Sequence, residues 1–231
     1  PLIAEWESEV EVLLAERERG IDRRVEIAMP QNLSVSQMVE LDSGEQAFAR
    51  RLRRPLPYKP NPHARRGTAF HAWIERRFGA TRLLDLDELP GAADAADGSD
   101  ADLAELQEKF LASPWASRSP SEVEVPFETV IGDTIIRGRI DAVFAEPDPA
   151  TGVTGWFVVD WKTGAPPTEK GRKAVDIQLA AYRVAWSELT GAPIDTVRAG
   201  FHYVRAELTV EPTDLPDRAE LADLLRGTRT Q

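Results

Sequence analysis

The sequence contains no cysteine, and this absence excludes several kinds of protein. Disulfide-stapled scaffolds, iron-sulfur clusters held by thiolates and catalysis by a thiol all require this residue. A chain without cysteine suits a reducing compartment, so we expect a cytoplasmic protein. The sequence also lacks an apolar run of membrane-spanning length and a secretion signal, so we expect no membrane partner. It begins at Pro1 rather than at methionine, and we interpret it as a piece of a longer polypeptide or a processed form.

Positive charge is scarce as well, with 28 basic against 39 acidic residues and a net charge of -11 at pH 7. Nucleic-acid binding usually needs a basic surface, so the total argues against such a partner. The distribution of charge weakens this objection. Nine acids and no Lys or Arg lie between Asp85 and Glu108, whereas eight Arg, one Lys and one Glu lie between Arg50 and Arg77. One region is therefore locally basic, and residues 85–102 are expected to form an acidic flexible insertion.

The length of 231 residues allows one good-sized core, with or without an appendage. We expect an N-terminal helical arm over residues 1–33 and one domain over residues 34–231. Within the arm, residues 3–19 read as a charged helix with an apolar stripe. This helix is either a linker or docking element or, as the more ordinary case, a solvated arm packed along one edge. The stripe consists of Trp6, Val10, Leu13 and Leu14.

Further helices are expected before the strands begin. One starts at Ser34 or Ser36 and runs towards Arg54, with a break at residues 42–44. The proline-rich residues 56–67 are expected to form a loop. Thr68 is then placed to cap a short helix that ends at Gly79. A helix over residues 103–111 follows the acidic stretch.

Strands dominate from residue 122 onward. Segments 122–130 and 134–144 are separated by a short turn that predicts a hairpin. A strand over residues 156–162 is apolar on both faces, so it should be central and covered on both sides. A helix at residues 175–189, strands near 196–204 and 207–210, and a helix from Pro216 complete the chain. The pattern predicts an α/β domain with a mixed central sheet flanked by helices.

The stretch VVDWKTG, residues 158–164, ends the central strand with an acid and an amine two positions apart. Side chains alternate along a strand, so Asp160 and Lys162 face the same way. Asp141 lies near the end of the preceding strand, which a hairpin could set alongside. Two carboxylates and the carbonyl of Trp161 suit a hard cation such as Mg²⁺ or Mn²⁺ better than zinc. Alone, an acid and a lysine at this spacing more often form a surface ion pair.

Two helices add polar side chains to this pattern. His71 borders the apolar stripe of the helix that ends at Gly79, where a lone histidine is more often packed or capping than a metal ligand. Gln178 and Tyr182 are four residues apart and share one face of their helix, as an ordinary polar helix edge also would. The order of all these motifs along the chain is what favours a functional site.

Four segments in this order resemble a known family: GTAFHAWIE, GRIDAVF, VVDWKTG and QLAAYR. They are similar to the motifs of the RecB-like branch of the PD-(D/E)XK nucleases. The stretch NPHARRGTAFHAWIERRFG resembles the C-terminal nuclease modules of the two-subunit Adn-type helicase-nucleases of actinobacteria, whose motors are similar to UvrD. The resemblance covers roughly residues 67–203 and implies a restriction-endonuclease-like core.

The resemblance also implies roles for individual residues. Glu124 falls where many members carry an acid, which is a less specific match. Some relatives hold an iron-sulfur cluster with four cysteines, which this chain lacks. The implied metal ligands are His71, Asp141, Asp160 and the carbonyl of Trp161, and the implied catalytic groups are Asp141, Asp160 and Lys162 with Gln178 and Tyr182 in support.

From this resemblance we expect Mg²⁺- or Mn²⁺-dependent hydrolysis of DNA phosphodiesters at broken DNA ends. The expected partners are DNA, single-stranded where a motor feeds it, a UvrD-like helicase domain in the same longer chain and a second helicase-nuclease subunit. Two alternatives remain: a non-catalytic DNA-binding or subunit-docking module with this fold, and a nuclease that acts alone. The expected contacts to the DNA backbone are Arg65, Arg66, Arg76 and Arg77 near the histidine, and Lys170, Arg172 and Lys173 in a loop after the central strand.

Overall fold

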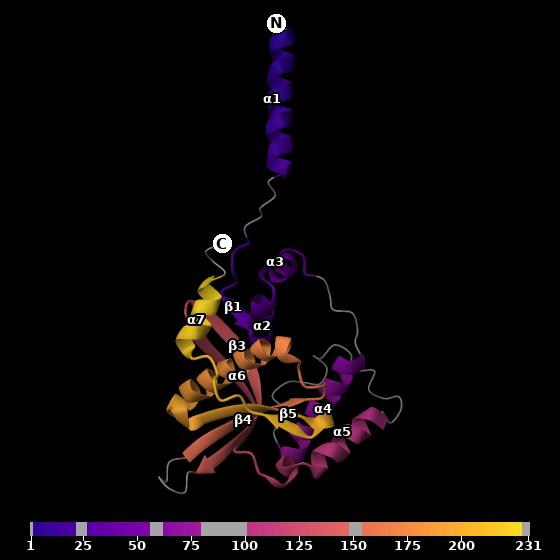
Figure 1. Cartoon of the computed structure of the whole chain (residues 1–231), viewed down its shortest axis with the longest axis vertical. Coiled ribbons are helices and arrows are strands. Elements are labelled where there is room, and N and C mark those ends of the chain that lie inside the picture. Colours follow the sequence, from indigo (N-terminus) through magenta and orange to yellow (C-terminus); the bar gives the residue numbers. More distant parts are fainter. Residues whose placement is uncertain (1, 22–26, 56–61, 80–100, 148–153, 228–231) are drawn as a thin grey trace.

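The computed structural model describes residues 2–21, 27–55, 62–79, 101–147 and 154–227. Within them a six-stranded sheet forms the centre, and helices cover both of its faces (Figure 1). This arrangement confirms the predicted α/β fold class. Most of the expected acidic insertion, residues 85–100, lies outside the described residues.

The sheet has the strand order β1-β3-β4-β5-β6, and β2 also pairs with β3. β1 with β3 and β4 with β5 are parallel pairs, whereas the other pairs are antiparallel. The predicted hairpin is thus the pair β2–β3, and the predicted central strand is β4. The strands are β1 (Asn32–Ser34), β2 (Glu122–Ile131), β3 (Thr134–Pro147), β4 (Thr154–Lys162), β5 (Val197–Tyr203) and β6 (Leu208–Val210).

Helices, joined by loops, make up much of the remaining described chain. They are α1 (Leu2–Ile21), α2 (Val35–Ser43), α3 (Glu45–Arg53), α4 (Pro62–Phe78), α5 (Ala101–Ala112), α6 (Glu169–Thr190) and α7 (Arg218–Gly227), with short 3-10 turns η3 (Pro114–Ser117), η4 (Ile194–Thr196) and η5 (Val204–Ala206). Within the described residues, no helix has the length and apolar content that crossing a bilayer would require.

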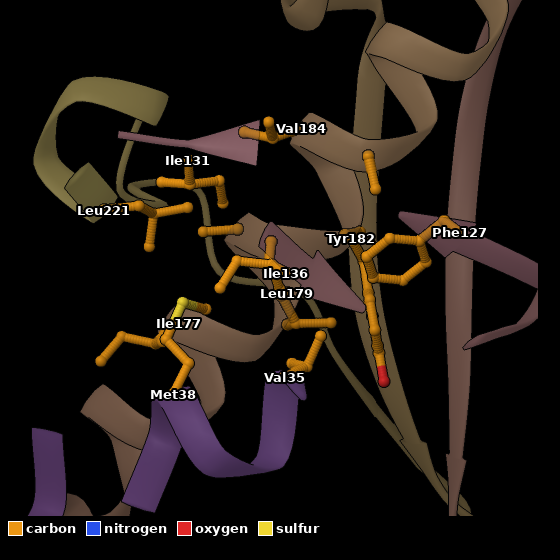
Figure 2. Packing of buried hydrophobic residues seen from close by; sticks show 14 of the residues in the cluster. Val35, Met38, Phe127, Ile131, Ile136, Ile177, Leu179, Tyr182, Val184 and Leu221 are labelled. Atoms are coloured by element: carbon orange, nitrogen blue, oxygen red, sulfur yellow. The ribbon is translucent and has the colours of Figure 1, made fainter. Parts of the chain in front are cut away.

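Each face of the sheet carries its own apolar core. The first core joins the sheet to α2, α6 and α7, and Figure 2 shows Met38 of α2 beside Ile177 of α6 within it. The second core joins the other face to α4, α5 and η3. Along β4, Val158 belongs to the first core and Trp161 to the second, which confirms that this strand is covered on both sides. Burial on both faces holds the end of β4 firmly in place.

Local signals place most helix ends. The Ser34 side chain accepts a hydrogen bond from the N–H of Gln37, and the Gln37 side chain accepts one from the N–H of Ser34. This capping box starts α2 at Ser34, the first of the two predicted caps. The predicted loop over residues 56–67 is wrong in its second half, because α4 already begins at Pro62. Proline is tolerated in the first turn of a helix, and Thr68 therefore lies inside α4 rather than capping it. Gly79, with φ of 75°, follows the last helical residue as predicted.

Two further predictions from the sequence differ from the structure. The helix expected at residues 175–189 begins at Glu169, so Lys170, Arg172 and Lys173 lie on α6 rather than in a loop. In α1, 71% of Trp6 and 63% of Leu13 is exposed, so this stripe is not packed along an edge of the described domain.

Candidate active site

The end of β4 presents an acid and an amine on the face that α6 covers. Asp160 is buried, and its Oδ2 atom lies 2.7 Å from Nζ of Lys162. The Lys162 ammonium also lies 4.4 Å from the centre of the Phe201 ring and 3.5 Å from Oε1 of Gln178. The expectation that Asp160 and Lys162 face the same way is confirmed. The ring of Phe201 on β5 packs against the ammonium and attracts it weakly through a cation–π interaction.

β3 and β4 separate just where the acids lie. Their backbone pairing runs from Pro147 to Ala142 and then stops, and the N–H of Trp161 donates instead to Oδ2 of Asp141 at 2.8 Å. A side chain thus replaces a backbone carbonyl as the acceptor. Asp141 lies inside β3, which runs on to Pro147, and not near its end as expected from the sequence. The separation leaves room for side chains of both strands to converge.

α4 brings a histidine to the same point. Nε2 of His71 lies 3.1 Å from the carbonyl oxygen of Trp161, and Nδ1 lies 3.4 Å from Oδ2 of Asp141. The adjacent Phe70 is fully buried in the second core and fixes the rotation of the helix. His71 is therefore not only a packing residue at the border of the apolar stripe, because both ring nitrogens face polar atoms of the two separated strands.

β2 contributes a third acid in an unusual conformation. Glu124 has φ of 50° inside a strand, a left-handed geometry that costs a non-glycine residue of the order of 1–3 kcal/mol. Its carboxylate lies 3.2 Å from Nη1 of Arg139. The sequence indicated Glu124 only weakly and did not indicate Arg139. The alternation of GRIDAVF could have found Arg139, since it lies two residues before Asp141.

Gln178 and Tyr182 of α6 both hold Asp160. Nε2 of Gln178 donates to Oδ1 of Asp160 at 3.2 Å and to the Tyr182 hydroxyl at 2.8 Å. The Tyr182 hydroxyl donates to the same Oδ1 atom at 3.1 Å. Phe127 packs edge-on against the Tyr182 ring at 5.9 Å. The two polar residues expected on one helix face therefore fix a carboxylate, which an ordinary polar helix edge would not do.

The electrostatics of the cluster are dominated by its acids. Burial lowers the pKa of His71, but the charges of Asp141, Asp160 and Glu124 outweigh it and raise that pKa to about 9. Burial and the charge of Asp141 raise the pKa of both Glu124 and Asp160. Burial alone would raise the pKa of Asp141, but His71 and the Trp161 N–H hold it below its usual value. Positive charge is thus required for all the acids to ionise together.

These donors fit a hard divalent cation. One ligand atom each of His71, Glu124 and Asp141 lie within 4.8 Å of one another. Oδ2 of Asp160 is buried and, although close to Lys162, accepts no hydrogen bond of regular geometry. A buried carboxylate oxygen is costly unless a cation lies against it, and in the free protein that cation is the Lys162 ammonium. Carboxylates with one imidazole suit Mg²⁺ or Mn²⁺.

The arginines expected to bind DNA are spread along α4. Arg65 and Arg66 lie in its first turns, where Arg66 pairs with Asp102 of α5. A methyl group at the adjacent Gly67 would lie 3.6 Å from Oγ1 of Thr163, so this end of α4 meets the end of β4. In the last turn, Arg76 bonds the carbonyl of its own helix at Ala72, and Arg77 bonds that of Ala116 at 3.1 Å.

The basic residues of α6 are arranged differently from the expectation. Nζ of Lys173 lies 2.5 Å from a carboxylate oxygen of Asp42 in α2. Arg172 is exposed, and the side chain of Lys170 is outside the described part of the chain. Among the described side chains, neither Arg172 nor Lys173 contacts the acids of the cluster. The structure therefore brings together the ligand and catalytic candidates but not this basic group.

Comparisons with known proteins bear on the fold and the family. A family model described as the PD-(D/E)XK nuclease superfamily matches residues 32–230. The chain is similar to a crystal structure from Eubacterium rectale, of a protein provisionally named an exonuclease, with a TM-score of 0.58 and 14% identity over 87% of this chain and 78% of that one. Alignment with the crystal structure of SSO0001 gives a TM-score of 0.39 and 15% identity over 95% of this chain and 84% of that chain. A search of curated proteins found no match.

Proposed function

Because this chain belongs to the PD-(D/E)XK nuclease superfamily, we propose that it is a metal-dependent deoxyribonuclease that hydrolyses DNA phosphodiesters. One observation carries the proposal: His71, Asp141 and the carbonyl of Trp161 meet at the point where Asp160 and Lys162 leave β4. An acid cluster of this kind would repel a phosphate by itself. A divalent cation bound between the acids and the substrate would remove this repulsion.

Mg²⁺ or Mn²⁺ would be held by His71, Asp141, Asp160 and the Trp161 carbonyl, with Glu124 as a further oxygen donor. When bound, such an ion polarises the phosphodiester and lowers the pKa of the attacking water. The neutral form of His71 is the one that can donate an electron pair to a metal. Since the acids raise the pKa of that histidine to about 9, metal binding should release its proton.

Lys162 is the residue placed to act on the reacting atoms. Its ammonium carries the positive charge nearest to Asp160 among the contacts described above, and Phe201 and Gln178 limit its position. We assign it the orientation of the nucleophile and the stabilisation of charge developing on the phosphate. Gln178 and Tyr182 are positioning residues, since they bond Oδ1 of Asp160 and leave Oδ2 to face Lys162.

The biological setting that we propose follows from the resemblance of the motifs to Adn-type nuclease modules. There the domain would act on a single DNA strand fed by a UvrD-like motor in the same polypeptide, with a second helicase-nuclease subunit, in the cytoplasmic repair and recombination of DNA ends. The basic start of α4, with Arg65 and Arg66, is where we propose that the strand approaches. The roles proposed for Arg76, Arg77, Lys170, Arg172 and Lys173 in DNA binding have less support, because the last turn of α4 and the start of α6 contact other parts of the protein.

Cleavage assays with labelled single-stranded and duplex DNA test the proposal directly. The wild-type domain, Asp160→Ala and Lys162→Ala would be compared in Mg²⁺, in Mn²⁺ and in EDTA. Glu211→Gln is a matched control, since it removes one carboxylate charge from an exposed ion pair with Arg198 at the opposite end of β5. We expect metal-dependent cleavage by wild type and control, and a loss of at least about a hundredfold in both site variants.

Cleavage that persists in both site variants would disprove the assignment of Asp160 and Lys162. DNA binding by the wild type without cleavage in any metal would favour the alternative of a non-catalytic binding or docking module. Titration of Mn²⁺ by calorimetry separates these outcomes, because the proposed centre binds the ion in the absence of DNA and Asp160→Ala weakens that binding.

A further inference from the structure

A network of charged side chains joins α4, α5 and η5 outside the proposed metal site. Asp102 at the start of α5 pairs with Arg66 of α4 and lies 3.9 Å from Nη2 of Arg205 in η5. Nη1 of Arg205 lies 3.4 Å from Oε2 of Glu105. Lys109 donates to the carbonyl of Arg205 at 2.8 Å and fixes the backbone of η5. Two guanidinium groups are thus turned towards the same carboxylate.

The network borders the reactive end of β4. β4 and β5 are parallel, and Lys162 is in register with Tyr203, so Arg205 follows only two residues beyond the level of the catalytic lysine. Gly67, next to Arg66, meets Thr163, which is the residue after Lys162. Both arginines therefore lie beside the sheet edge at which Lys162 ends its strand. A nucleic-acid strand whose reacting phosphate is at Lys162 has its neighbouring phosphates within reach of this edge.

The acids of the network are the more accessible partners. The exposed fractions of the Asp102 and Glu105 side chains are 46% and 47%, against 22% for Arg66 and 34% for Arg205. Ion pairs exposed to this extent are weak, so a competing anion can displace one at little cost. A carboxylate and a phosphodiester each offer two oxygens to a guanidinium fork, and they compete for the same donors.

We propose that Arg66 and Arg205 form a binding site for a DNA phosphate adjacent to the one that is cleaved, and that Asp102 occupies this site in the free protein as a competitor from the same chain. The inference rests on the proposed nuclease function. It adds a substrate contact, Arg205, and a competing carboxylate of the same chain that weakens DNA binding. DNA must displace Asp102 to engage both arginines. Strands that are held in place by a motor domain meet this requirement more readily than DNA arriving by diffusion.

Equilibrium binding of a fluorescent oligothymidylate, measured by anisotropy in EDTA at several salt concentrations, tests the proposal without requiring cleavage. The variants are Asp102→Asn, Arg205→Gln and Arg205→Lys, with Glu211→Gln as the control for loss of one carboxylate charge far from this edge. We expect Asp102→Asn to tighten binding about two- to fivefold, while Glu211→Gln changes it by less than about 1.5-fold. Arg205→Gln should weaken binding and reduce the slope of log affinity against log salt by about 0.7, and Arg205→Lys should keep that slope.

Equal affinities of Asp102→Asn and Glu211→Gln would overturn the competitor role. An unchanged salt slope in Arg205→Gln would overturn the phosphate contact, and a fall in thermal midpoint with no change in binding would show that the network serves stability alone. Absence of binding in wild type and Asp102→Asn alike also overturns the proposal. Failure of the nuclease assignment appears separately, as a wild-type protein that shows these binding changes but cleaves no DNA in Mg²⁺ or Mn²⁺.

Discussion

Raising the pH in the absence of metal should destabilise the domain through a single residue, His71. Its pKa is raised from 6.5 to about 9 because three acids surround it. A group whose pKa is raised by folding contributes stability in full below its unfolded value, and the contribution disappears as the pH passes the folded value. The His71 contribution is therefore complete below pH 6.5 and is lost as the pH rises through 9.

The size of the effect follows from the same shift. A pKa change of this size corresponds to roughly 3 kcal/mol of unfolding free energy. Since 31% of the His71 side chain is exposed, solvent screening reduces the expectation to about 2 kcal/mol. In His71→Gln no proton is bound at this position, and this part of the pH dependence should vanish.

Urea denaturation in EDTA at several values between pH 6.5 and 9, on wild type and His71→Gln, measures the difference directly. Wild type should lose about 2 kcal/mol more than the variant across this range. Addition of Mn²⁺ at the alkaline end should restore wild type but not His71→Gln, because a cation takes the place of the proton among the acids. Parallel pH curves for the two proteins would refute the reasoning and with it the electrostatic description of the cluster.

Three further predictions concern the supporting structure. Gly138→Ala should lower the free energy of unfolding by about 1–3 kcal/mol in urea, because its methyl group would lie 2.6 Å from the Phe127 ring, which packs on Tyr182. Burial lowers the pKa of His202 to about 4. Acid should therefore lower the free energy of unfolding by up to roughly 3 kcal/mol as the pH falls from 6.5 to 4. In acid titrations followed by circular dichroism, His202→Gln should flatten this pH dependence. Ser34→Ala removes a capping hydrogen bond of α2 and should lower the thermal midpoint by the equivalent of about 1 kcal/mol, whereas the exposed Ser119→Ala should not.

The alternation of side chains along a strand was sufficient to predict part of the site. It placed Asp160 and Lys162 on one face and Trp161 on the other, and the structure agrees. Helical spacing in the same way placed Gln178 and Tyr182 together, and both hold Asp160. These rules are local, and they succeed where a side chain's direction depends only on the element that carries it.

Features that depend on contacts between elements could not be predicted in this way. The sequence does not reveal that the Asp141 side chain replaces a backbone acceptor for the Trp161 N–H, since this depends on how β3 and β4 separate. The left-handed backbone of Glu124 is imposed by its surroundings against the preference of the residue. The earlier start of α4 is a different kind of miss, because Pro62 stands in the first turn of the helix, where proline is tolerated. The pairing of Arg66 with Asp102 likewise joins two helices that are distant in sequence.

Trp161 contributes to the proposed site with its backbone and to the second core with its side chain. Its indole packs edge-on against Phe110 at 5.2 Å and against Trp115 at 5.8 Å, while its carbonyl faces His71. A main-chain oxygen is present whatever residue occupies the position, so a mutational scan that replaces side chains cannot delete this donor. Substitutions can shift this carbonyl oxygen only indirectly, by altering the aromatic rings that pack against the Trp161 indole. If the proposed site binds its ion, variation among these buried aromatic residues is a route by which selection can tune that affinity without changing any ligand.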